Sequence, residues 1–156
     1  MNGSKFLRMT AAGKWLAVVL VAAGLCGAAA AQQTTATDYE GTFGGVYRAN
    51  QGITRVVLVL EAINFNEVAA RYVFYPDNSN HNVATGEFLL QGAVDEKTGR
   101  LVLVGKQWID QPRGYVMVDV ACQLSTDRKS LSGQVYLHED KSVKWDFRAA
   151  RWSRQP

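Results

Sequence analysis

The side chains that could carry out acid–base or metal chemistry are few and lie far apart along the chain. His81 stands in the polar stretch PDNSNHNVATG, and His138 precedes Glu139 and Asp140. A structural zinc site needs about four ligands and a catalytic one about three plus water. Two histidines and one internal cysteine therefore predict no metal site, and His138-Glu139-Asp140 is expected to be a solvated hairpin end.

Catalytic motifs are not evident either. Glu61 and Asp119 lie inside apolar runs, and both are expected to point outward at basic side chains on neighbouring strands. A Ser-His-Asp assembly is defined by geometry, but no nucleophile elbow or Gly-rich phosphate loop accompanies these residues. The sequence therefore predicts no catalytic residue and no cofactor.

The best candidate for binding is the loop WIDQPRGY at 108–115. Two large aromatic residues, Trp108 and Tyr115, bracket Asp110 and Arg113, and aromatic bodies with nearby polar groups suit sugars or peptide side chains. The alternative is that Trp108 and Tyr115 are core anchors at the base of a hairpin, with an ordinary Pro-Gly turn between them.

The first 31 residues have the layout of a secretory signal peptide. Lys5, Arg8 and Lys14 precede the apolar stretch at 15–23, and a Gly-Ala run ends at Ala31. This order predicts export to the periplasm or the medium. The apolar stretch is shorter than the roughly 20 residues of a membrane span, so membrane contact is expected only through this segment.

The two cysteines belong to different parts of the chain. Cys26 follows Ala23-Gly24-Leu25 within the predicted signal, and lipidation of Cys26 is the alternative to its removal with the peptide. The bulky Leu25 stands where lipoprotein signals have a small residue, which favours removal. Cys122 would then be the single thiol of the mature protein, and its apolar surroundings predict a buried, inert side chain.

The charge of the mature chain argues against a nucleic-acid partner. Residues 1–31 carry three of the 17 basic residues and none of the 14 acidic ones, so the rest has a net charge of zero. Proteins held on phosphates need a positive field.

After residue 40 the chain has the pattern of an all-β domain. Short apolar runs recur about every ten residues, which predicts an antiparallel meander of about eight strands, either a β-barrel or a β-sandwich. The expected strands are 44–50, 53–63, 67–75, 86–94, 100–109, 114–124, 131–138 and 143–151. The expected organisation is a signal peptide at 1–31, a flexible lead at 32–39, one β domain at 40–152 and a tail at 153–156. Residues 53–63 and 100–109 are apolar on both faces, which predicts that these strands are central or cross a place where both faces are covered.

The mature chain resembles a small exported bacterial β domain of uncharacterised function. The shared pattern begins with Gly-x-Tyr-x-Cys-x-Gln-Gly and includes Trp-Ile-x-x-Pro-x-Gly-Tyr. The matches here include Gly45, Tyr47, Gln51-Gly52, Thr98-Gly99-Arg100-Leu101, Trp108-Ile109, Pro112, Gly114-Tyr115 and Phe147. Ala49 and Lys144 stand at the two Cys positions of the pattern. The resemblance implies export and a β fold, and it implies no activity.

These observations together predict a non-enzymatic exported domain that recognises a protein or a component of the cell envelope. The candidate binding residues are Trp108, Asp110, Arg113 and Tyr115. A small-ligand-binding β-barrel with its pocket near Trp108 and Tyr115 is the first alternative. A hydrolase acting on a wall or host polymer is the second.

Overall fold

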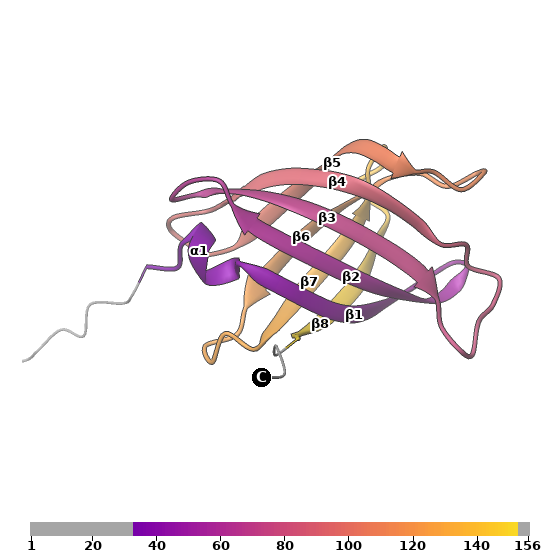
Figure 1. The fold of residues 1–156 in the computed structure, drawn as a ribbon, viewed down its shortest axis with the longest axis horizontal. Helices are drawn as coiled ribbons and strands as arrows, with labels where there is room; N and C mark the ends of the chain where they lie inside the picture. Colours follow the sequence, from indigo (N-terminus) through magenta and orange to yellow (C-terminus); the bar gives the residue numbers. More distant parts are fainter. Residues whose placement is uncertain (1–32, 153–156) are drawn as a thin grey trace, which may run out of the picture. The chain divides into compact units, whose positions relative to one another are not determined.

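The protein forms a β-barrel in which strands follow one another around the ring. The computed structural model describes residues 33–152, and within them the chain has one short helix and eight antiparallel strands (Figure 1). Each strand pairs with the next, and β1 pairs with β8 to close the barrel. The elements are α1 (Ala36–Tyr39), β1 (Gly41–Ala49), β2 (Gly52–Ala62), β3 (Glu67–Pro76), β4 (Gly86–Val94), β5 (Leu101–Asp110), β6 (Val118–Leu124), β7 (Ser130–Leu137) and β8 (Lys144–Arg151). The predicted all-β meander is confirmed, and it is a barrel rather than a sandwich.

Some predictions concern residues that the structure does not describe. The signal peptide at 1–31 with its Cys26, and the tail at 153–156, lie outside the described residues. Within 33–152, no helix has the length and apolar character needed to cross a membrane.

Alternation of side chains between the two faces of each strand fills the barrel. In β2, Val56, Leu58 and Leu60 are at most 1% exposed, whereas Val57 and Val59 between them face outward and are half-buried. In β5, the outward Val102 is 44% exposed. Both strands pair with a neighbour on each side, as central strands do, but the expectation of a place where both faces are covered is wrong. A closed barrel has one interior, and the second apolar face lies on its outer surface.

The helix α1 closes one end of the barrel. Ala36 and Tyr39 are fully buried, and the Tyr39 hydroxyl donates to the Gly99 carbonyl at 2.7 Å and accepts the Leu124 N–H at 3.1 Å. The Arg151 guanidinium lies 4.4 Å from the centre of the Phe43 ring and donates to a carbonyl of α1. The lead that the sequence predicts to be flexible thus contains a helix with two fully buried side chains.

Three turns share this closed end with α1. In the β2–β3 turn, the Asn64 side chain accepts the backbone N–H groups of Asn66 and Glu67. The β4–β5 turn ends on Gly99 with φ 66°, a left-handed conformation that glycine adopts readily. In the β6–β7 turn Arg128 adopts φ 59°, so this turn reaches the same conformation without glycine. The remaining loops lie at the opposite end of the meander.

Candidate functional site

The loop between β5 and β6 leaves the sheet and folds over the open end of the barrel. The sequence predicts a strand over 114–124, but β6 begins only at Val118. β5 pairs with β6 over Leu101–Leu103 alone, although β5 continues to Asp110. Residues 111–117 are therefore free of the ladder, and Tyr115 reaches the barrel interior instead of continuing a strand.

A cavity of about 280 Å³ lies at this open end. Most of its wall is aromatic or aliphatic, and the polar contributions come from tyrosine hydroxyls and one amide. The lining residues are Tyr47, Gln51, Tyr72, Phe74, Phe88, Gly114, Tyr115, Val116, Val118, Leu137 and Trp145. Ligand sites are typically concave and mostly apolar, with a few polar groups that fix orientation. This cavity has that composition.

The aromatic rings are packed against one another in fixed geometries. Tyr72 stacks on Phe88 with centroids 4.8 Å apart, and Phe74 stacks on Tyr115 at 5.3 Å and 17°. Across the cavity, Tyr47 lies 6.2 Å from Trp145. Offset or tilted ring pairs at these distances contribute beyond their buried area, so the cavity wall is preorganised.

Contacts between loops hold Tyr115 in place. Its hydroxyl accepts the Ala84 N–H at 2.9 Å, which joins the β5–β6 loop to the β3–β4 loop. The Gln111 side chain donates to the Tyr115 carbonyl at 3.0 Å. Gly86 gives space for this arrangement, because a Cβ there would meet Phe74 at 2.4 Å and the Pro112 ring at 2.7 Å. The two loops therefore form one lid across part of the opening.

One polar atom of the cavity wall is buried without a partner. Among the described residues, the Tyr72 hydroxyl has no hydrogen bond. The Tyr47 phenol lies close enough to affect the pKa of Tyr72, but the two hydroxyls do not reach ordinary hydrogen-bond geometry. Burial raises the pKa of Tyr72 well above 10.0, and the Tyr47 phenol raises it further. Tyr72 is therefore a neutral phenol at physiological pH.

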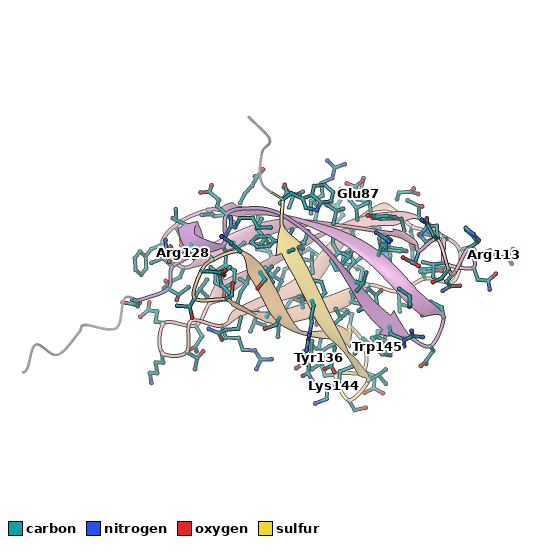
Figure 2. All side chains as sticks on the ribbon, turned by 90° about the horizontal axis from the view of Figure 1, so that it is seen from below. Glu87, Arg113, Arg128, Tyr136, Lys144 and Trp145 are labelled. Carbon is teal, nitrogen blue, oxygen red and sulfur yellow. The ribbon has the colours of Figure 1, made fainter. Side chains whose placement is uncertain are left out.

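The four candidate binding residues of the 108–115 loop separate in the structure. Tyr115 lines the cavity, and Trp108 packs behind the wall with its ring 5.0 Å from Phe88. Asp110 and Arg113 are exposed and do not line the cavity. Figure 2 shows Arg113 at the tip of one end of the barrel, opposite the end that carries Arg128.

Sequence reasoning missed most of the aromatic wall, although a signal for it exists. Tyr47, Tyr72, Phe74, Phe88 and Trp145 occupy inward positions of β1, β3, β4 and β8. In an up-and-down barrel, the ends of odd-numbered strands and the starts of even-numbered strands meet at one opening. Inward aromatic residues concentrate at those strand ends.

The seam between β5 and β6 is held by a side chain where the ladder stops. The Asp119 carboxylate accepts the Gly105 N–H at 2.9 Å and contacts His138 Nδ1 at 2.8 Å and the Lys141 ammonium. Asp119 occupies an outward position of β6, as predicted, yet it is only 5% exposed because His138 and Lys141 cover it. The predicted solvated hairpin end holds for Glu139 and Asp140, which are exposed, and not for His138, which is half-buried against Asp119. β6 and β7 carry Val118 and Leu137 into the cavity beside this cluster, so Asp119 supports the cavity wall.

Replacing Asp119 by alanine is expected to lower the free energy of unfolding by about 2–3 kcal/mol, because the buried Gly105 N–H loses its charged acceptor. Urea unfolding followed by circular dichroism measures this. Asp119→Asn, which keeps an acceptor oxygen, should lose less. Asp146→Ala, at an exposed position of β8, is the control and should stay within about 0.5 kcal/mol of the parent. Equal stability of the two alanine variants would show that the seam does not depend on Asp119.

The described residues hold no evident metal centre. Within 33–152, no three His, Cys, Asp or Glu side chains gather in a group that could hold an ion. Cys122 is 1% exposed, and burial raises the pKa of its thiol from 9.0 to about 12. The prediction of a buried thiol is confirmed, and a thiol with this pKa is a poor nucleophile.

Comparison with known proteins gives a fold relationship and no family. No family model matches the chain, and no curated protein matches it. A solved structure described as the de novo design of a fluorescence-activating β-barrel is similar, with a TM-score of 0.53 and 12% sequence identity. The similarity covers 75% of this chain and 96% of the designed one. At this identity the likeness concerns the fold alone.

Proposed function

We propose that the chain is an exported, non-enzymatic β-barrel that binds a small uncharged ring compound in its open end. The observation that carries this proposal is the cavity of about 280 Å³ with its packed aromatic wall. Among the described residues, no charged side chain lines it. Burying an unpaired charge is costly, so a neutral ligand fits best.

The volume sets the size of the ligand. An engineered apolar cavity of about 150 Å³ binds benzene, and drug-sized ligands occupy roughly 300–1,000 Å³. A cavity of about 280 Å³ therefore suits a molecule of one or two rings. The stacked pairs Tyr72–Phe88 and Phe74–Tyr115 favour a planar shape.

Binding of a small molecule is better supported than the protein or envelope partner that the sequence first suggests. That suggestion rests on the 108–115 loop, of which Tyr115 faces the cavity while Asp110 and Arg113 lie outside it. The similar designed barrel, described as fluorescence-activating, is compatible with a small-molecule role for this fold. Export rests on the pattern of residues 1–31, and a described lining without carboxylate, histidine or cysteine side chains is compatible with binding without turnover.

Calorimetric titration of the purified protein with naphthalene tests the proposal. We expect saturable binding of one molecule per chain. Leu137→Trp fills the cavity from its wall and should weaken binding at least tenfold. Ser132→Trp places the same side chain at an exposed position of the same strand and should leave binding unchanged. Absence of saturable binding, or equal loss in both variants, contradicts the proposal.

A further inference from the structure

One polar group in the cavity wall, the Tyr72 hydroxyl, indicates which ring compounds the cavity prefers. We propose that the Tyr72 hydroxyl is the ligand-selecting group of this site, and that the ligand is a planar neutral molecule with one hydroxyl or carbonyl group that hydrogen-bonds to it. This inference rests on the proposed function and names the chemical class of the ligand.

The first support is the state of the hydroxyl itself. Tyr72 is fully buried, and its oxygen has no hydrogen-bond partner among the described residues. Most buried polar side-chain atoms in folded proteins are hydrogen-bonded, and an unsatisfied one destabilises the protein. An unsatisfied hydroxyl at the wall of a cavity is explained if a bound ligand supplies its hydrogen-bond partner.

The second support is the way the Tyr72 ring is held. The ring stacks on Phe88, whose ring packs against Trp108 at 5.0 Å, and β3 pairs Tyr72 with Leu58 on its other side. The phenol therefore cannot swing away to seek a partner without disrupting this packing. A fixed donor in a binding pocket discriminates strongly against ligands that lack a matching group.

The surroundings restrict the polar group to one small region of the cavity. Thr54 is fully buried and accepts a hydrogen bond from the Gln51 amide at 3.4 Å, so that pair is already satisfied in part. The Phe74 and Phe88 side chains in the wall carry no hydrogen-bonding group. A ligand with one polar substituent and an otherwise apolar body matches this distribution.

Paired titrations with naphthalene and 2-naphthol test the inference. The hydroxyl of 2-naphthol is better solvated by water, so it should bind less tightly than naphthalene unless the site supplies a partner. We expect the reverse in the parent protein, an advantage of about tenfold for 2-naphthol, which corresponds to one hydrogen bond. Tyr72→Phe, which keeps the ring, should abolish this advantage, so that 2-naphthol binds no more tightly than naphthalene. Tyr75→Phe, at a half-buried position that does not line the cavity, is the matched control and should keep it.

Thermal unfolding without ligand gives a second, independent readout. Because Tyr72→Phe removes an unsatisfied buried hydroxyl, we expect its Tm to rise by about 4 °C. A fall in Tm would show that the hydroxyl is satisfied in the empty protein and would overturn the inference. If naphthalene binds but 2-naphthol has no advantage, the inference is wrong and the proposed function stands. If neither compound binds, the proposed function itself fails.

Discussion

Replacing Tyr39 by alanine is expected to lower the free energy of unfolding by about 3–5 kcal/mol, as for other large aromatic side chains removed from a core. Tyr39 is fully buried and is among the largest such side chains of the barrel. It closes the end of the barrel opposite the cavity, so its removal would leave a void beneath α1. Because the void opens toward solvent as α1 detaches, we expect the helix and the barrel end to loosen together.

Two further variants separate the contributions at this position. Tyr39→Phe keeps the ring but leaves the Gly99 carbonyl and the Leu124 N–H without the hydroxyl, which should cost about 1–3 kcal/mol. Thr37→Ala, at an exposed position of the same helix, should change stability by less than about 0.5 kcal/mol. Urea unfolding measures all three. A Tyr39→Ala variant as stable as Thr37→Ala would mean that α1 does not close the barrel.

The strands were predictable because period-two alternation determines which face is buried. The starts of β3, β4 and β7 differ from prediction by at most one residue, since Gly and polar residues mark the turns before them. The choice between barrel and sandwich was not predictable in the same way. Both folds bury one face of each strand, and only the pairing of β1 with β8 distinguishes them.

The position of the site was half predictable. The sequence singled out the segment 108–115 because aromatic residues flank polar ones there, and Tyr115 does line the cavity. Yet alternation alone extended the following strand back to residue 114, whereas the ladder ends at Val118. Residues 114–117 leave the sheet because Tyr115 makes contacts with residues that are distant in the sequence. Its ring stacks on Phe74, and its hydroxyl accepts the Ala84 N–H. The alternation of apolar and polar residues along one strand cannot predict such contacts.

The burial of Asp119 and the formation of α1 depended even more on tertiary context. Asp119 sits at an outward position of β6, where alternation predicts exposure, and it is buried because His138 and Lys141 cover it. The four residues of α1 are too few for helical periodicity to be visible. The local signal was the Asp38 carboxylate accepting the Thr35 N–H at 2.9 Å, three residues apart, which is one half of a capping box.

The second large effect is expected in alkaline solution. Burial raises the pKa of the Cys122 thiol from 9.0 to about 12 and the pKa of Tyr39 from 10.0 to about 12. The pKa values of Tyr47 and Tyr72 are raised as well, again chiefly by burial. In each case the unfolded chain releases a proton at a lower pH than the folded protein, so ionisation favours unfolding. Stability is therefore complete below about pH 9 and is lost as the pH rises toward 12.

The thiol contributes more to this loss than Tyr39 does, because its pKa rises further. At about 1.4 kcal/mol per pH unit, a pKa that rises from 9.0 to about 12 corresponds to roughly 4 kcal/mol. Urea unfolding at pH 8, 9, 10 and 11 should show a progressive fall in the free energy of unfolding. Cys122→Ala removes one of the titrating groups, so its curve should fall less steeply from pH 9 upward, whatever its stability at pH 8. Cys122 is 1% exposed and lies on β6 between β5 and β7. Parallel curves for the parent and the variant would mean that Cys122 ionises as readily in the barrel as in the unfolded chain, and would contradict this prediction.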